Sequence, residues 1–329
     1  MEKKQDNLME ISDLTVRYNT DDAVVHAVNN FNLKLVRGEA RGLVGETGAG
    51  KTTLALSILR LLPERVGEVT GGSIVYDGQE LLNLPEAEML PLRGKRISMI
   101  FQDPMTSLNP TQTVGDQILE VLNLHFPEMT REEKNKRVDE MMTLVGIPPQ
   151  RKKSFPHEFS GGMKQRVVIA MALVAEPELL LADEPTTALD VTIQAQILEL
   201  MKQLREKLNT SVRLITHDLC VVAQFCDSVS VVYAGRVVEY GPVEIVFQRK
   251  ENHPYTAGLF NCIPNLHDDQ PRLHPIAGHM ADPRVEYKGC CFADRCEYAT
   301  ERCRTEAPSM HVCGEHGILC HRYAEKEEF

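Results

Sequence analysis

The chain has 329 residues, 43% of them hydrophobic and 25% charged, which suits one large globular domain with an extension, or two domains. Its formal net charge of −11 argues against a nucleic-acid partner, because binding to a phosphate backbone needs a basic face. The longest apolar run, Val167–Ala175, is far shorter than the roughly 20 residues that span a bilayer, and the first residues lack the apolar core of a signal peptide. We therefore expect a cytosolic protein that reaches membranes only through partners.

The first part of the chain is predicted to be rich in strands. Residues 8–16 and 31–36 alternate apolar and polar side chains, as half-buried strands do, and could form a strand pair. Residues 52–62 carry apolar side chains on most faces of a helix, so we expect a buried helix there. Short apolar runs predict further strands at residues 40–44, 72–76 and 97–101.

The middle of the chain changes to helices. Residues 104–160 are helix-rich, and we interpret them as a helical insert. Within the insert, apolar side chains repeat at helical spacing over residues 132–145, which predicts an amphipathic helix. Its apolar side consists of Val138, Met141, Met142 and Val145.

Strands and helices alternate after the insert. Helices are predicted at 163–175 and 192–208, and apolar strands at 178–182 and 212–216. This alternation predicts an α/β fold with a parallel sheet covered on both faces.

The pattern gives way near Gly241 to a tail rich in proline, histidine and cysteine. We therefore predict a main domain over residues 1–240, which contains the helical insert, and a C-terminal extension over residues 241–329.

A glycine-rich loop lies between the predicted strand at 40–44 and the predicted helix at 52–62. Its pattern fits a phosphate-binding P-loop, whose glycines let backbone N–H groups wrap the phosphates. Lys51 would reach the terminal phosphates, and Thr52 would bind Mg²⁺. A tight glycine turn is the alternative, but the flanking strand and helix favour the phosphate site. The candidate nucleotide-binding residues are Gly45, Glu46, Thr47, Gly48, Ala49, Gly50, Lys51, Thr52 and Thr53.

Two carboxylates, Asp183 and Glu184, end the apolar strand at 178–182. A buried strand often ends in a polar turn, but beside a P-loop a functional role is favoured. Asp183 would then hold Mg²⁺, and Glu184 would polarise the attacking water as a general base. Gln102 follows the strand at 97–101, where it could be a surface amide or could sense Mg²⁺ and the γ-phosphate. His217 ends the strand at 212–216, at the edge where α/β sheets bind ligands, so a γ-phosphate contact is favoured over a structural role.

A second turn suited to an anion stands at Ser160, Gly161 and Gly162, followed by Gln165. It places backbone N–H groups and a hydroxyl at a predicted helix N-terminus. Two phosphate-directed elements in one chain suggest that each nucleotide is shared between two chains.

These motifs stand in the order found in ATP-binding cassette ATPases, which the chain resembles from residue 8 to about 240. P-loop, Gln102, Ser160-Gly161-Gly162, Asp183-Glu184, Ala188-Leu189-Asp190 and His217 look like the Walker A, Q-loop, signature, Walker B, D-loop and switch-histidine motifs. The resemblance implies a P-loop NTPase (RecA-like) parallel sheet with an N-terminal antiparallel β subdomain, an inserted helical subdomain and a small Cys-rich C-terminal extension.

The same resemblance implies how the site works. Two ATPase subunits pair head to tail, so that each ATP lies between one P-loop and the other subunit's Ser-Gly-Gly turn, with Mg²⁺ bound by Thr52, Gln102 and Asp183. Gln165 and Asp190 are expected to serve the nucleotide too, and Tyr18 to stack on adenine, although it could equally be a packing residue at a strand end. Glu184 and His217 are the expected catalytic residues.

Finer features narrow the resemblance to dipeptide and oligopeptide importer ATPases. These are the stretches Ala182–Asp190 and Thr216–Leu219, then His253-Pro254-Tyr255-Thr256 with Leu259 and Ile263-Pro264, and the tail Gly289–Cys296. The resemblance implies two membrane permease subunits, a second and related ATPase, and, indirectly, an extracytoplasmic peptide-binding protein. The subunit would lie peripherally on the cytoplasmic face of the inner membrane. Nickel chelates, glutathione and antimicrobial peptides are alternative solutes.

Six of the nine cysteines fall between Cys290 and Cys320, without an export signal that would favour disulfides. The spacing of Cys290, Cys296, Cys303 and Cys320 misses both the usual zinc pairs and the common ferredoxin runs, so it indicates a metal site of unknown type. The resemblance implies a [4Fe–4S] cluster, with zinc or free thiols as alternatives. Cys291, Cys313, His311, His316 and His321 are competing ligands, whereas Cys220, Cys226 and Cys262 are predicted to be ordinary thiols.

The sequence thus favours an ATPase that powers peptide import. Two other classes are weighed against it. A non-transport cassette protein would carry long coiled coils, two cassettes or a basic surface, and none is visible here. A regulatory subunit that binds ATP without turnover is disfavoured by the presence of Glu184 and His217.

Overall fold

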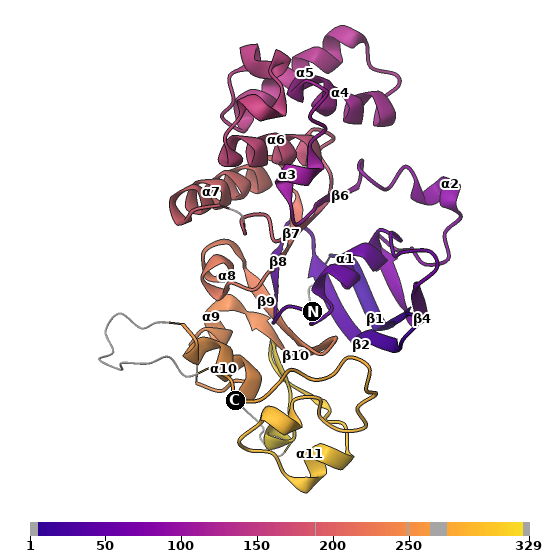
Figure 1. The fold of residues 1–329 in the computed structure, drawn as a ribbon, viewed down its shortest axis with the longest axis vertical. Helices are drawn as coiled ribbons and strands as arrows, with labels where there is room; N and C mark the ends of the chain where they lie inside the picture. The colour runs from indigo at the N-terminus through magenta and orange to yellow at the C-terminus, as the bar shows by residue number, and fades with distance from the viewer. Residues whose placement is uncertain (1–5, 188, 249, 264–274, 325–329) are drawn as a thin grey trace. The chain divides into compact units, whose positions relative to one another are not determined.

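The computed structural model describes residues 6–187, 189–248, 250–263 and 275–324 (Figure 1). Ala188 and Pro264, which belong to two of the sequence motifs, lie outside these ranges. By their internal contacts the described residues fall into two units. Within the described ranges, the first is drawn from residues 6–7, 36–40 and 83–215, and the second from residues 8–35, 41–82 and 216–324.

The first unit combines parallel strands of a β-sheet with the helical insert. Strand β7 pairs in parallel with both β6 and β8, and all five of its residues are buried, as a strand covered on both faces requires. The elements are α2 (Glu86–Met89), β6 (Ile97–Ile100), α3 (Pro104–Ser107), α4 (Val114–His125), α5 (Arg131–Leu144), η1 (Pro149–Lys153), η2 (Pro156–Glu158), α6 (Gly161–Leu173), β7 (Leu179–Asp183), α7 (Val191–Leu208) and β8 (Ser211–Thr216).

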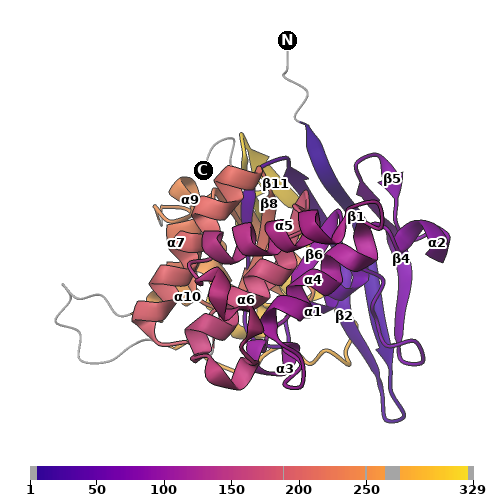
Figure 2. The same ribbon diagram turned by 90° about the horizontal axis from the view of Figure 1, so that it is seen from above.

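The structure confirms that the predicted insert is rich in helices. Helices α4, α5 and α6 contact one another, and Figure 2 shows them packed together. Thr130 and Glu133 form a reciprocal capping box at the start of α5, which fixes where the helix begins. The apolar side predicted for this helix is buried, at Val138, Met141, Met142 and Val145.

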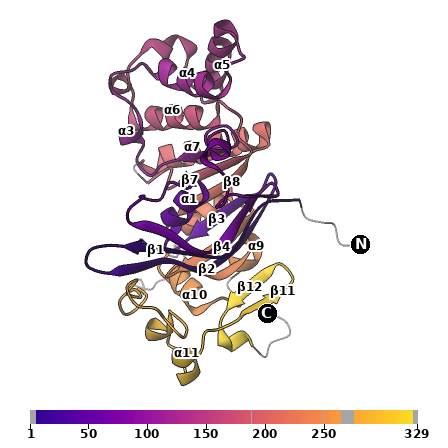
Figure 3. The same ribbon diagram turned by 90° about the vertical axis from the view of Figure 1, so that its right-hand side faces the viewer.

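The second unit contains two sheets. In the N-terminal sheet the strand order is β2-β1-β4-β5, and β1 pairs antiparallel with β4. In the other, β3 pairs in parallel with β9, and the antiparallel strands β10, β12 and β11 follow in that order. Figure 3 shows β12 and β11 side by side. The elements that precede residue 83 are β1 (Asn7–Asn19), β2 (Val24–Val36), β3 (Ala40–Val44), α1 (Lys51–Ile58), β4 (Gly67–Tyr76) and β5 (Gln79–Glu80).

The remaining elements of the second unit follow β8. They are α8 (Leu219–Phe225), β9 (Ser228–Tyr233), β10 (Arg236–Pro242), α9 (Val243–Val246), α10 (Pro254–Asn261), η3 (Ala293–Arg295), α11 (Glu301–Thr305), β11 (Met310–Cys313), β12 (His316–Leu319) and η4 (His321–Tyr323). The predicted strands and helices of the main domain are thus found, and the α/β class with its antiparallel N-terminal sheet is confirmed.

One prediction on local structure was wrong. The helix after the P-loop ends at Ile58, not at residue 62, because Arg60 adopts a left-handed conformation (φ 52°) that a right-handed helix cannot include. The tail also holds regular structure that its composition does not reveal. Strand β12 pairs with β10 at Glu239↔Ile318 and Tyr240↔Gly317, and four-residue strands fixed by such distant partners leave little periodicity in the sequence.

Candidate functional site

The phosphate loop connects β3 to α1 in the second unit, as its sequence predicts. Gly50 caps α1 with φ 91°, and a Cβ atom at this position would lie 2.2 Å from the Ala27 carbonyl oxygen. Only glycine therefore fits here. The loop is also tied to its surroundings, because Gly235 N–H donates to the Ala49 carbonyl at 3.1 Å. The result is a fixed turn at a helix N-terminus, the geometry that binds phosphates.

Lys51 lies inside this loop, with 6% of its surface exposed. Its ammonium Nζ donates to the carbonyl oxygens of Gly45 at 2.7 Å and Glu46 at 3.0 Å. Two residues further on, Thr53 Oγ1 accepts a hydrogen bond from the Tyr18 hydroxyl at 3.2 Å. The structure therefore brings Tyr18, at the end of β1, to the first turn of α1, but adenine stacking by this ring stays a prediction.

Two residues that the sequence analysis did not single out as site residues hold Glu46. The Glu46 N–H donates to the Tyr255 hydroxyl at 2.9 Å. The Arg295 guanidinium binds the Glu46 carboxylate with both forks, at 2.7 Å for Nη1–Oε2 and 3.2 Å for Nη2–Oε1. Burial raises the pKa of Tyr255, so its hydroxyl is neutral. Burial lowers the pKa of Arg295, but Glu46 and Tyr233 raise it by more, so the net shift is upward.

Glu184 lies at the end of β7 in the first unit and is held by neighbours from two other segments. Gln102 Nε2 donates to Glu184 Oε2 at 3.2 Å, and Thr187 Oγ1 donates to the same oxygen at 2.9 Å. The Glu184 N–H donates to the Ile215 carbonyl at 2.9 Å. Its φ of 46° is unusual for a residue with a Cβ atom. The structure thus places Gln102 against Glu184, next to the buried Asp183, whereas the predicted role of Gln102 as a sensor of Mg²⁺ and the γ-phosphate stays a prediction.

The Ser-Gly-Gly turn opens helix α6. Ser160 caps the helix, and its Oγ accepts from Met163 N–H at 3.4 Å, while Ser160 and Gly161 are both exposed. The turn packs against α7, because a Cβ atom on Gly162 would lie 2.6 Å from Ile193 Cγ2. Asp190 caps α7 by accepting from Thr192 N–H at 3.1 Å and Ile193 N–H at 3.0 Å. The start of α6 is thus exposed at Ser160 and Gly161, a setting that suits an anion.

Gln165 differs from the other signature residues. It has 0% exposure, and neither polar atom of its amide has a hydrogen-bond partner among the described residues. Its predicted role toward a nucleotide on another chain stays a prediction, which now requires a rearrangement around α6. His217, by contrast, is exposed immediately after β8, and the next residue, Asp218, caps α8 by accepting from Cys220 N–H at 2.8 Å.

The four predicted cluster cysteines line one small cavity in the C-terminal extension. Cys290, Cys296, Cys303 and Cys320 surround about 20 Å³, room for about one ion or water-sized group. Burial raises the pKa of Cys290 to about 12, which disfavours the thiolate unless a positive charge is present. In the described part of the chain, however, no group of three or more His, Cys, Asp or Glu side chains is arranged to hold a metal ion.

The competing ligands are mostly engaged elsewhere. His316 Nε2 bonds Glu239 at 2.8 Å, and His311 Nε2 bonds the Ser309 hydroxyl at 3.1 Å. Cys291 points at the Tyr233 carbonyl, with Sγ 3.9 Å from the oxygen. Of the competitors, His321 does line the cavity. All nine cysteines lie within the described ranges, and none forms a disulfide.

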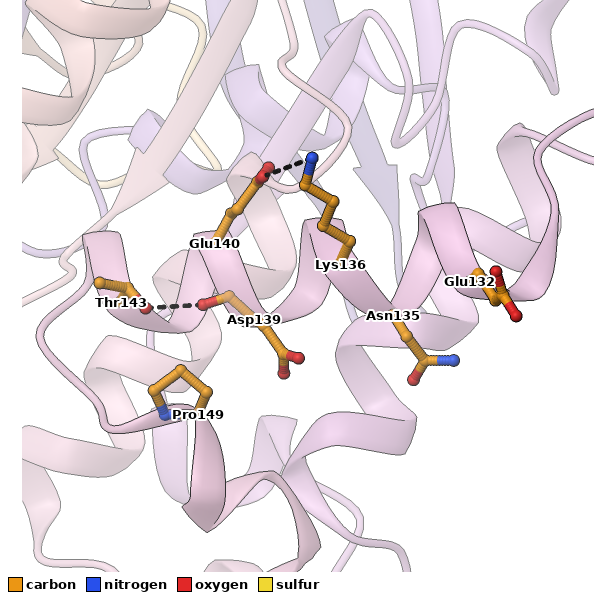
Figure 4. Close-up of a pocket in the computed structure, with 7 residues that line it drawn as sticks. All are labelled: Glu132, Asn135, Lys136, Asp139, Glu140, Thr143 and Pro149. Atoms are coloured by element: carbon orange, nitrogen blue, oxygen red, sulfur yellow. Dashed lines mark hydrogen bonds and ion pairs between the residues drawn. The ribbon is translucent and has the colours of Figure 1, made fainter.

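A separate groove of about 560 Å³ lies on the outer face of α5 and ends at Pro149 (Figure 4). Its charged side chains pair locally, because Lys136 Nζ lies 3.8 Å from Glu140 Oε1, and Asp139 is bound by Lys152 at 2.7 Å. None of the predicted site residues lines it, so we assign it no part in the chemistry. Within the described ranges, no helix has the length and apolar character needed to cross a bilayer.

Comparisons with known proteins identify the family of this chain. The family described as "ABC transporter" matches residues 28–187, and the family "Oligopeptide/dipeptide transporter, C-terminal region" matches residues 238–303. A relative from Haemophilus influenzae, an oligopeptide transport ATP-binding protein, is 46% identical over 98% of this chain and 98% of its own. The protein of the same name in Bacillus subtilis is 48% identical over 98% of this chain and 91% of its own.

Solved structures show the same fold. A dimeric ATP-binding cassette in a post-hydrolysis state, bound to ADP and phosphate, is 28% identical and matches with a TM-score of 0.64 over 71% of this chain and 98% of its own. A cassette of a Clostridium perfringens ABC transporter complex is 31% identical, with a TM-score of 0.65 over 75% of this chain and 93% of its own. With near full-length relatives at 46% identity and above, the chain belongs to the oligopeptide-transport ATP-binding family of ABC transporters.

Proposed function

We propose that the chain hydrolyses ATP and so powers the import of di- or oligopeptides through an ABC transporter. The observation that carries the proposal is the arrangement at Glu184, where a carboxylate at the end of a buried strand is held by Gln102 and Thr187. A carboxylate fixed in this way can orient and deprotonate a water molecule. The family supplies the context, because the named function of its members is oligopeptide transport.

The residues would divide the work as follows. Backbone N–H groups of the loop at 45–50 cradle the phosphates, and Lys51 exchanges its carbonyl partners for phosphate oxygens. Thr52, Asp183 and Gln102 would be the ligands of Mg²⁺, which when bound would supply positive charge to stabilise the reacting phosphates. Glu184 then activates water, and His217 contacts the γ-phosphate.

Each nucleotide would be completed by a second ATPase subunit. Ser160 and Gly161 are exposed at the N-terminus of α6, which suits phosphates held by another chain. A dimer of a related cassette has been solved with ADP and phosphate, which supports pairing. We propose that the partner ATPase is a different but related chain, and that Gln165 and Asp190 serve the shared site.

The remaining partners would be two membrane permease subunits and, outside the membrane, a peptide-binding protein. The chain would then lie peripherally on the cytoplasmic face of the inner membrane. The helical insert would pass closure of the ATPase pair to the permeases, since Gln102 lies two residues before α3. We propose the main domain at residues 1–240 and the extension at 241–329 as the functional division.

The test is purification of the tagged chain from native membranes, followed by identification of its partners. We expect two permease subunits and a second ATPase, and ATP hydrolysis that rises when peptide and its binding protein are added. Nickel chelates and glutathione, added to the same complex, are the matched controls for solute class. Copurification with DNA or ribosomes, without permeases, would contradict the proposal.

We further propose that the cavity cysteines hold the [4Fe–4S] cluster that the family resemblance implies. The donor chemistry fits, because four cysteines line one cavity and cluster irons prefer thiolates, but the thiols must move together and the cavity must widen to admit four irons. Cys290, Cys296, Cys303 and Cys320 would be the ligands. A bound cluster would supply a cross-link for a short, loop-rich segment with little core of its own.

Anaerobic purification tests the cluster. We expect absorbance near ~400 nm and about four irons per chain, which is the content of one [4Fe–4S] centre. Cys296→Ser should lower the iron content sharply, whereas Cys220→Ser, which changes an exposed thiol outside the cavity, should leave it unchanged. Stoichiometric zinc, or no metal in either aerobic or anaerobic preparations, would rule the cluster out.

A further inference from the structure

We propose that the C-terminal extension sets the ATP affinity of this subunit, with Arg295 and Tyr255 as positioning residues that hold Glu46 of the phosphate loop. The inference rests on the proposed ATPase function and adds a structural determinant of it. Neither side chain needs to touch the nucleotide.

The extension holds Glu46 at two points. Tyr255 accepts from its backbone N–H at 2.9 Å, which fixes the main chain at the start of the loop. Arg295 binds its carboxylate through two parallel hydrogen bonds, and such a bidentate pair fixes direction as well as distance. The carbonyl of the same residue accepts from Lys51 Nζ at 3.0 Å. A shift of Glu46 would therefore move both the loop backbone and its lysine.

Arg295 is itself held firmly by the extension. Its side chain is only 5% exposed. Its Nε donates to the Ala277 carbonyl at 3.1 Å, and Nη2 donates to the Ile276 carbonyl at 3.3 Å. Its guanidinium also lies 5.9 Å from the centre of the Phe292 ring. The arginine therefore acts as a rigid bridge rather than as a mobile surface charge.

Tyr255 has an equally fixed setting. It is fully buried, and its ring packs against two other aromatic rings. Its ring centre lies 4.7 Å from that of Tyr233, on β9, and 5.5 Å from that of Phe292. Strand β9 pairs with β3, which leads into the phosphate loop. The extension is thus connected to the loop in two ways. Its side chains contact Glu46 directly, and Tyr255 packs against β9, the strand that pairs with β3.

A purely structural ion pair would change stability but not the response to nucleotide. A positioning pair keeps the loop in its binding conformation, so its loss lowers the fraction of binding-competent loops. If that fraction falls to about one tenth, the apparent Kd for ATP rises about tenfold, while turnover at saturating ATP changes little. The separation of KM from kcat therefore distinguishes the two roles.

The variants are Arg295→Gln, Arg295→Lys and Tyr255→Phe, with Arg284→Gln as the matched control. Arg284 lies in the same extension and pairs with Asp282 at 2.7 Å, but its side chain is 65% exposed and does not contact the loop. In the full chain, Kd for MgATP is measured with a fluorescent nucleotide and competing ATP. The Tm without nucleotide and, in the assembled complex, KM and kcat complete the set.

We expect Arg295→Gln to raise Kd and KM for ATP about tenfold, with kcat within about twofold of the wild-type value. Arg295→Lys and Tyr255→Phe should raise Kd and KM by less. Arg284→Gln should match the wild type. Adding Glu46→Gln to Arg295→Gln should weaken binding no further, because the two residues act as one unit. Wild-type affinity in folded Arg295→Gln would overturn the inference. If that variant does not fold, unchanged affinity in both Arg295→Lys and Tyr255→Phe would overturn it. Failure of the wild type itself to bind ATP would instead refute the proposed function.

Discussion

Replacing Glu184 by glutamine is expected to abolish ATP turnover while leaving ATP binding intact. The amide has nearly the same shape and can still accept from Gln102 and Thr187 through its oxygen, but it cannot take a proton from water. Loss of a general base typically lowers the rate by about 10²–10⁴-fold. Steady-state ATPase activity of the assembled complex, together with nucleotide binding, measures the two effects separately.

The trapped state gives this prediction a second readout. If hydrolysis opens the ATPase pair, the Glu184→Gln subunit should accumulate in a closed, ATP-bound dimer that size-exclusion chromatography resolves. Glu199→Gln, at an exposed position on α7, is the matched control and should behave as the wild type. Full turnover by Glu184→Gln would contradict the role assigned to this carboxylate.

Replacing Lys51 by alanine is expected to remove most of the nucleotide affinity. The Lys51 ammonium is nearly buried against the loop carbonyls, so it offers a preformed positive charge to the phosphates. Truncating one partner of a desolvated charge pair costs about 2–5 kcal/mol, which corresponds to a loss of binding of about 30-fold to several thousand-fold. Titration with a fluorescent ATP analogue measures it.

Two further lysine variants sharpen this test. Lys207→Ala removes an exposed positive charge at the end of α7 and should leave ATP affinity unchanged. Lys51→Arg keeps the charge but puts a planar group into a tight loop, so we expect it to restore little binding. Affinity close to that of the wild type in Lys51→Ala would mean that the loop holds phosphates without this side chain.

The features predicted correctly from the sequence are those that local pattern determines. The loop before α1, the buried strand that ends at Asp183 and the serine cap of α6 each depend on residues within a few positions of one another. Their physical causes are glycine at φ 91°, burial on both faces and a side-chain cap, and all three leave a signature in the sequence.

Features that depend on distant contacts could not be predicted in this way. Arg295 lies 249 residues from Glu46, and nothing in the local sequence distinguishes a buried arginine from a solvated one. The pairing of β12 with β10 is long-range for the same reason. The burial of Gln165 could have been predicted from the local sequence, because the apolar residues that follow it indicate a helix covered on most faces.

The bond between Arg295 and Glu46 also has a consequence for biosynthesis. A growing chain emerges from the ribosome N-terminus first, so the phosphate loop is made long before Arg295 exists. Until the C-terminal extension has folded against the phosphate loop, Glu46 lacks both of its extension partners. A nascent or prematurely terminated chain would then bind ATP weakly and consume little of it. Synthesis and folding of the C-terminal extension would therefore be required before the chain binds and hydrolyses ATP efficiently.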